Sequence, residues 1–164
     1  CIDVGTGAGF PGIPLKIAFP QLQIMLLDSL NKRVGFLNTV IQELGLTGIT
    51  AVHGRAEDFG RNKEYREQFD LCVSRAVANL STLSEYCLPF VRVGGIFLAA
   101  KGPQVKEELS QAEKAFQLLG GRAEKTTEYF LPDGSGRTLV TVKKERATPA
   151  LYPRHGSKIA KKPL

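Results

Sequence analysis

A glycine-rich segment, DVGTGAGFPG, lies within the first twelve residues of this 164-residue chain. It follows a short apolar run and precedes a stretch in which Pro14 suits the first turn of a helix that we expect to end near Phe19. The glycines of the loop, which permit tight turns and close approach of a ligand to the backbone, are Gly5, Gly7, Gly9 and Gly12. A strand, a glycine loop and a helix in this order predict an α/β fold with a ligand at the end of the first strand.

The same alternation of strand and helix continues along the chain. Apolar runs predict strands over 23–28, 49–54, 69–76 and 94–102, and helical spacing predicts helices over 30–44, 81–91 and 109–119. We expect Ser29 to cap the first of these helices and Gly45 to end it. These units predict a doubly wound parallel sheet. Two further strands, joined by a PDGSG turn, add an antiparallel hairpin at its edge.

Three classes of ligand use loops of this kind. A nucleotide-triphosphate loop needs a lysine and a serine or threonine after its last glycine, where this chain has Ile13 and Pro14. Asp28 ends the second strand and could accept hydrogen bonds from the ribose of a nicotinamide dinucleotide or of S-adenosylmethionine, or it could be an ordinary helix-start acid. The hairpin, and Asp3 ahead of the glycines, favour the Rossmann-like fold of class I S-adenosylmethionine-dependent methyltransferases, because nicotinamide dehydrogenases normally continue with another parallel unit.

Positive charge is concentrated at the end of the chain. Residues 143–164 carry seven lysines and arginines against one acid, whereas the rest of the chain carries 15 of each sign. We therefore expect a domain over 1–144 and an extended basic tail over 145–164, whose charge suits a polyanion or is simply solvated. No apolar run approaches the roughly 20 residues that span a bilayer, so no membrane partner is expected. Three cysteines without CxxC spacing indicate a reducing cytoplasm and no metal site.

Several longer motifs resemble those of one enzyme family. In chain order they are DVGTGAGFPGIPL, LLDSLNKRVGFL, HGRAEDF, DLCVSRAVANL, LAAKG and a terminal YPR…KKPL. Together they are similar to the RsmG family, also called GidB, of rRNA guanine-N7 methyltransferases. The resemblance implies methyl transfer from S-adenosylmethionine to N7 of a guanine in 16S ribosomal RNA by a cytoplasmic monomer, whose partner is that RNA or the small ribosomal subunit. Family members carry a helical segment before the glycine loop. Only the end of a strand precedes the loop here, so we expect that segment to be missing from this sequence.

The resemblance also implies roles around the cofactor. The cofactor-binding residues would be Gly5, Gly7, Phe10, Asp28, Ser29, Leu30, Ala56, Glu57 and Arg75. Gly5 and Phe10 would line the methionine end, residues 28–30 would face the ribose and adenine, and residues 56–57 would hold the adenine. Arg75 would lie at the mouth, between the cofactor and the target base. Simpler interpretations are a core aromatic for Phe10, a helix-start acid at position 57 and a solvated side chain for Arg75.

The reaction places few demands on side chains. Guanine N7 carries an in-plane lone pair and no proton, so no general base is needed, and the chain holds only His53 and His155. We expect Arg75 to be the catalytic residue that orients the guanine through its guanidinium fork, and Cys72 to be a core residue. The residues expected to bind RNA are Lys101, Tyr152, Arg154, Lys158, Lys161 and Lys162. Open alternatives are a methyltransferase of a small molecule or protein, a dinucleotide-binding oxidoreductase and a non-catalytic nucleic-acid-binding module.

Overall fold

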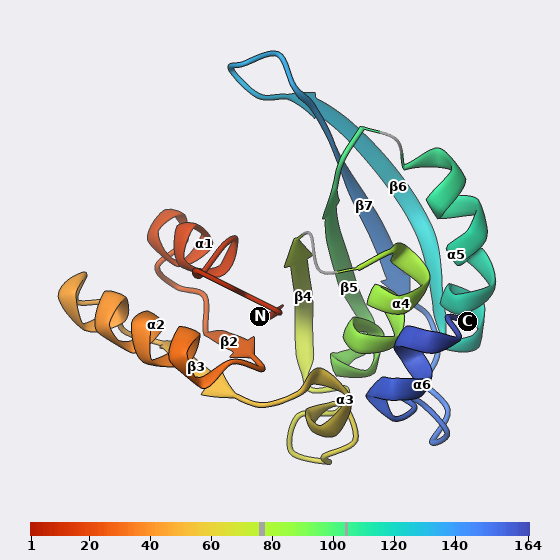
Figure 1. The fold of residues 1–164 in the computed structure, drawn as a ribbon, viewed down its shortest axis with the longest axis horizontal. Coiled ribbons are helices and arrows are strands. Elements are labelled where there is room, and N and C mark those ends of the chain that lie inside the picture. Colours follow the sequence, from red (N-terminus) through yellow and green to blue (C-terminus); the bar gives the residue numbers. More distant parts are fainter. Residues whose placement is uncertain (76–77, 104) are drawn as a thin grey trace.

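A computed structural model describes residues 1–75, 78–103 and 105–164. These residues form a seven-stranded sheet with the strand order β3-β2-β1-β4-β5-β7-β6 (Figure 1). The strands are β1 (Ile2–Val4), β2 (Ile24–Asp28), β3 (Ile49–His53), β4 (Phe69–Arg75), β5 (Val91–Lys101), β6 (Gly121–Phe130) and β7 (Gly136–Lys144). Strands β1 to β5 are parallel, and β7 lies antiparallel between β5 and β6. The predicted parallel sheet with a terminal antiparallel hairpin is therefore confirmed.

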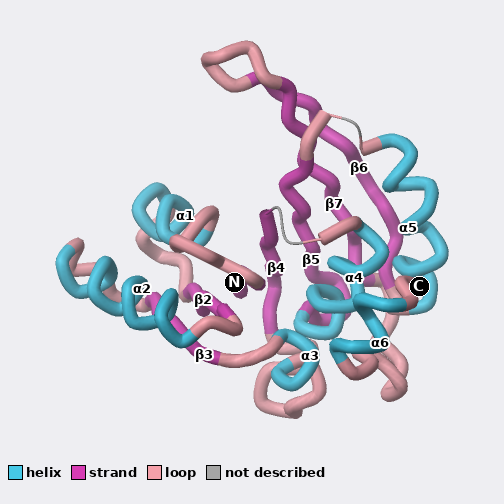
Figure 2. The backbone as a smooth tube through the Cα atoms, viewed as in Figure 1, coloured by secondary structure: helices cyan, strands magenta, loops and turns pink. Residues whose placement is uncertain are grey.

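Helices cover both faces of the sheet. They are α1 (Gly12–Ala18), α2 (Asn31–Glu43), α3 (Ala56–Phe59), α4 (Leu80–Cys87), α5 (Lys106–Leu118) and α6 (Gly156–Lys161), with a 3-10 turn over Leu88–Phe90. In Figure 1, α1 and α2 lie on one side of the sheet, and α4, α5 and α6 lie on the other. No helix in the described ranges is long and apolar enough to cross a bilayer. The far end of the β6–β7 hairpin projects beyond the helices (Figure 2).

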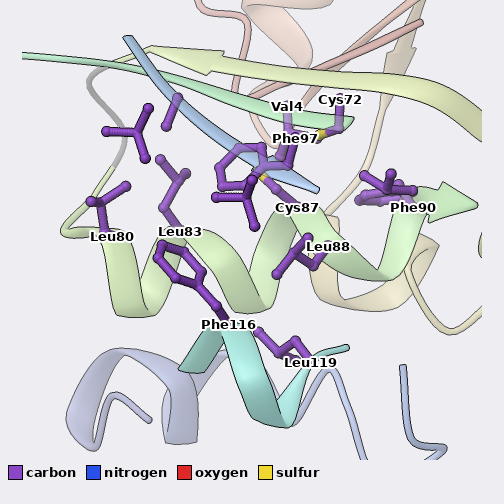
Figure 3. Packing of buried hydrophobic residues seen from close by; sticks show 14 of the residues in the cluster. Val4, Cys72, Leu80, Leu83, Cys87, Leu88, Phe90, Phe97, Phe116 and Leu119 are labelled. Carbon is purple, nitrogen blue, oxygen red and sulfur yellow. The ribbon is translucent and has the colours of Figure 1, made fainter. Parts of the chain in front are cut away.

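Two apolar clusters hold these layers together. The larger one packs α4 and α5 against the sheet and includes Leu83, Phe97 and Phe116, all of them buried (Figure 3). Cys72 lies within it, as expected for a core cysteine. Each large apolar side chain buried in this way contributes about 1.5–3 kcal/mol. The smaller cluster joins α1 and α2 to the opposite face of the sheet and includes Leu37.

Local boundaries differ from the sequence-based expectations at several elements: β5 begins at Val91 and α5 at Lys106, each three residues early, and the differences at α2 and α4 have a local cause. Leu30, not Ser29, is the N-cap residue of α2, and its own apolar side chain makes no capping hydrogen bond. The carboxylate of Asp28 takes that role in part, because its Oδ1 accepts the N–H of Leu30 at 2.9 Å. The helix expected over 81–91 ends at Cys87 and continues as a 3-10 turn, since Pro89 has no N–H for an α-helical bond.

The C-terminal tail is not extended throughout, as we had expected it to be. Residues 156–161 form α6, whose Ile159 is fully buried and which packs on α4. The approach to this helix is held by arginines from the segment that follows α3. Arg66 donates to the carbonyl oxygens of Tyr152 and Thr148, and Arg61 donates to that of Pro153. Basic side chains distant in the sequence thus fix the tail to the domain.

Candidate functional site

The glycine loop crosses the carboxyl end of β1, where parallel α/β sheets bind their ligands. The N–H of Gly5 donates to the carbonyl oxygen of Leu27 on β2 at 2.9 Å, which ties the loop to the neighbouring strand. Gly7 has a φ of +63°, a conformation that L side chains rarely adopt. A Cβ placed there would meet no atom within 4 Å, so the backbone at Gly7 faces open space. The outer surface of the loop is therefore accessible to a ligand.

A buried carboxylate on β1 holds both ends of the loop. Oδ2 of Asp3 accepts hydrogen bonds from the hydroxyl of Thr6 at 2.7 Å and from the N–H of Gly12 at 2.9 Å. Its other oxygen, Oδ1, has no hydrogen-bond partner among the described residues. Burial raises the pKa of Asp3 to about 6, against the opposing effect of these two hydrogen bonds. Asp3 is thus a structural support for the loop.

Asp28 supports the same loop from β2. Its Oδ2 accepts the N–H of Gly7 at 2.9 Å and lies 3.4 Å from the guanidinium of Arg33. Only 2% of Asp28 is exposed, but it lines a cavity together with Gly7 and Ser29. A carboxylate has about four acceptor positions, so Asp28 keeps capacity for a ligand hydroxyl beyond the contacts that it makes within the protein.

Two cavities meet beside the loop. The first, of about 350 Å³, is lined by Val4, Gly5, Leu27, Ser29, Gly54, Arg55, Ala56, Glu57, Ala78, Thr82, Tyr86 and Ala160. The second, of about 370 Å³, is lined by Gly5, Thr6, Gly7, Ala8, Phe10, Asp28, Ser29, Arg33 and Arg75. Both include Gly5 and Ser29, so they adjoin each other at the carboxyl ends of the strands, and together they are here called the groove. We call the first the α4-side cavity and the second the loop-side cavity.

The groove brings together eight of the nine residues that were predicted to bind a cofactor. Leu30 is the exception, because it lies at the start of α2 with its side chain half exposed and lines neither cavity. Ala56 and Glu57 are the first two residues of the short helix α3, and both also line the α4-side cavity. Their position is therefore compatible with a helix-start acid and with a ligand-binding residue. The buried carboxylate of Glu57 accepts a hydrogen bond from Nε of Arg55 at 2.8 Å.

Some cavity-lining residues were not predicted from the sequence. Thr82 and Tyr86 reach the α4-side cavity from α4, and Ala160 reaches it from α6. Burial, and secondarily the Glu57 carboxylate, raises the pKa of Tyr86, which keeps its hydroxyl protonated and able to donate. No local motif marks these side chains, because they come to the groove only through the packing of distant helices.

Arg75 and Phe10 lie together in the loop-side cavity. The guanidinium carbon of Arg75 lies 5.5 Å from the centre of the Phe10 ring, within the range of a cation–π contact. Phe10 is 49% exposed, so it is not a core aromatic. Arg75 ends β4, which is joined to β1 by the hydroxyl of Ser74 donating to the carbonyl oxygen of Val4 at 2.7 Å. Ala76, the last residue of the SRA motif, lies outside the described residues.

The residues predicted to bind RNA occupy different environments. Lys101 donates to the carbonyl oxygen of Ala78 and pairs with Glu108 at 2.6 Å, and Arg154 pairs with the buried Glu85 at 2.6 Å. Tyr152 is half buried against the large core cluster. The side chains that remain exposed, here called the tail lysines, are Lys158, Lys161 and Lys162. An RNA contact by any of the six stays a prediction.

Comparison with known proteins agrees with this architecture. A profile of the family described as "GidB: rRNA small subunit methyltransferase G" matches residues 1–133. Ribosomal RNA small subunit methyltransferase G of Desulforamulus reducens is 54% identical over 164 residues, which are 99% of this chain and 68% of that protein. The same-named protein of Alkaliphilus metalliredigens is also 54% identical, over 99% of this chain and 69% of its own.

Solved structures with low sequence identity show the same fold. One is that of M. jannaschii TYW2 in complex with AdoMet, with a TM-score of 0.68 and 14% identity over 88% of this chain and 68% of that one. Another is that of a putative methyltransferase from Thermoplasma acidophilum, with a TM-score of 0.68 and 9% identity over 90% of this chain and 68% of that one. The fold and the match to the profile and relatives agree, and the chain belongs to the rRNA small subunit methyltransferase G (GidB) family.

Proposed function

We propose that this chain transfers the methyl group of S-adenosylmethionine to N7 of a guanine in 16S ribosomal RNA. The observation that carries the proposal is the convergence of the glycine loop, Asp28, Glu57 and Arg75 on one groove at the carboxyl ends of the strands. Membership of the rRNA small subunit methyltransferase G family supports the same substrate class.

The residues of the groove fit S-adenosylmethionine. In the loop-side cavity, the open backbone at Gly7 and the carboxylate of Asp28 suit the methionine and ribose portions. In the α4-side cavity, the partly exposed Ala56 offers apolar surface for a purine, with Glu57 beside it as a polar group. When bound, the sulfonium of this cofactor supplies an electrophilic methyl group for in-line displacement. The protein's task is then to orient the two reactants.

Arg75 has the chemistry and the position to orient the guanine. Guanine N7 attacks through its own lone pair and releases no proton, so the groove needs no general base. Neither cavity is lined by a histidine among the described residues. The guanidinium fork of Arg75 can donate to guanine O6 or to a phosphate, and the ring of Phe10 beneath it limits its movement. The N7 lone pair is then left free for methyl transfer.

RNA binding completes the proposal. The tail lysines are exposed on and next to α6, the same helix that contributes Ala160 to the groove. Lysines bind phosphates as point charges, and such contacts weaken steeply as salt increases. They therefore provide affinity for the RNA backbone near the site, while the groove selects the base.

Single-turnover methylation of 16S rRNA with labelled cofactor tests the role of Arg75. At saturating cofactor, Arg75→Ala is expected to lower the rate about 100-fold, the size of effect that loss of substrate positioning produces. The matched control is Arg92→Ala, which removes an exposed arginine at the amino-terminal end of β5, away from the carboxyl ends of the strands where the groove lies. This control is expected to keep the wild-type rate.

Three results would contradict the proposal. An unchanged rate in Arg75→Ala, with cofactor bound, would remove the orienting role of this arginine. Mapping of the label to an atom other than guanine N7 would reject the assigned product. Binding of NADH in place of S-adenosylmethionine would favour a dinucleotide-binding oxidoreductase instead.

A further inference from the structure

The C-terminal helix α6 takes part in the walls of the groove. Ala160 lines the α4-side cavity together with Ala56 and Glu57, although about a hundred residues separate them in the sequence. The fully buried Ile159 and the packing against α4 hold the helix at this place. The tail is therefore positioned to influence whatever occupies this cavity.

A close approach of backbone to side chain connects α6 with Glu57. Gly156 is the first residue of α6, and a Cβ placed on it would overlap Oε1 of Glu57. Glu57 is buried and accepts from Nε of Arg55 at 2.8 Å, so a Cβ at position 156 would force its carboxylate to shift, and the open space beside it is the cavity that it lines. The absence of a side chain at position 156 thus allows Glu57 its present position in the cavity.

A buried ion pair fixes the chain just before Gly156. Glu85 on α4 is completely buried and accepts hydrogen bonds from the backbone N–H of Arg154 at 2.7 Å and from its Nη2 at 2.6 Å. Nε of Arg154 donates to the same carboxylate at 2.9 Å. Because breaking such a pair leaves a buried charge uncompensated, this segment is strongly held in one place. The ion pair between Arg154 and Glu85 therefore fixes the start of α6 beside the groove.

From this arrangement we propose that α6 is a wall of the cofactor site and that Gly156 is a positioning residue for Glu57. The inference rests on the proposed function, since it takes the α4-side cavity as the place of the cofactor's adenosine portion. One consequence is that the affinity for S-adenosylmethionine depends on the C-terminal tail, although the basic composition of this tail indicates RNA binding. Displacing Glu57 through Gly156 weakens cofactor binding and leaves the presentation of the guanine by Arg75 unchanged.

The test compares two Gly→Ala variants of the full chain. Gly156→Ala is expected to raise the Kd of S-adenosylmethionine, measured by calorimetry, about tenfold, which corresponds to about 1.4 kcal/mol. The KM for the cofactor should rise to a similar extent, whereas kcat at saturating cofactor should stay within about twofold of wild type. The control Gly35→Ala lies in the middle of α2, where a Cβ meets no atom within 4 Å, and it should change neither constant.

A second variant covers the case in which Gly156→Ala disturbs folding. Ala160→Trp keeps a helix-compatible residue on α6 and fills the α4-side cavity from its outer wall, so it should also raise the Kd at least tenfold with little change in Tm. Equal Kd values for wild type and both variants would overturn the inference and leave the proposed function intact. Failure of the wild-type chain to bind S-adenosylmethionine would overturn both.

Discussion

The buried carboxylate of Asp3 makes the stability of the protein depend on pH in an unusual direction. Burial raises the pKa of Asp3 from its ordinary value of 3.8 to about 6 in the folded protein. Between these two values the folded state holds a proton that the unfolded state has released. Raising the pH through this window therefore lowers the free energy of unfolding, which is the opposite of the usual behaviour of a paired carboxylate.

The size of the effect follows from the shift of the pKa. A shift of about two units corresponds to about 3 kcal/mol in total, of which about 2 kcal/mol falls between pH 4.5 and pH 7. Asp3→Asn removes the titrating group and keeps an oxygen that can accept from Thr6 and Gly12. The difference in unfolding free energy, variant minus wild type, should thus increase by about 2 kcal/mol from pH 4.5 to pH 7. The intrinsic cost of the amide is the same at each pH and cancels.

Urea unfolding of both proteins at pH 4.5, 5.5, 6.5 and 7.5 measures this difference. Asp70→Asn is the control, because Asp70 is exposed and its pKa is lowered by the hydrogen bond from Arg92. Its pH-dependent difference should be small and of opposite sign. Parallel stability curves for wild type and Asp3→Asn would refute the reasoning, since they would show that Asp3 titrates alike in the folded and unfolded chains.

Two further predictions concern the tail. Arg154→Met leaves Glu85 buried without its partner and should lower the free energy of unfolding, measured with urea, by about 3–5 kcal/mol. The control Arg92→Met breaks an exposed ion pair and should lower it by at most about 1 kcal/mol. Replacing all three tail lysines by glutamine should weaken RNA binding and reduce the slope of log K against log salt by up to about 2, since each lost phosphate contact removes about 0.7. An unchanged slope would show that these lysines do not contact phosphates.

The sheet and the loop-side cavity could be predicted because their signals are local. The run IMLLD forms β2 with all five residues buried, which is the pattern of a parallel strand covered on both faces. The glycine loop, Asp28 and Arg75 each lie at the carboxyl end of a strand, so topology alone brings them to one edge. For these residues, the positions of the strand ends were enough to predict that they line one cavity.

The α4-side cavity could be predicted only in part, because its walls depend on helix packing. Tyr86 lies on the largely buried α4 and Ala160 on the short α6, and neither helix sequence contains a pattern that is specific to a ligand. The role of Arg154 was equally hidden, since its partner Glu85 lies 69 residues earlier in the chain. Charge counted along the sequence does not distinguish an arginine that binds a buried carboxylate from one that faces solvent.

The difference between paired and solvent-facing basic residues changes how much positive charge the C-terminal segment can offer to a polyanion. Lys144 is fully buried, donates to the carbonyl oxygens of Leu88 and Val91, and has its pKa lowered to about 8 by burial. Arg154 is likewise engaged, so part of the positive charge of residues 143–164 holds the tail to the domain. The charge left for a polyanion is smaller than composition suggests, but it lies on and beside the helix that lines the groove. An RNA held by the tail lysines would therefore lie next to this groove.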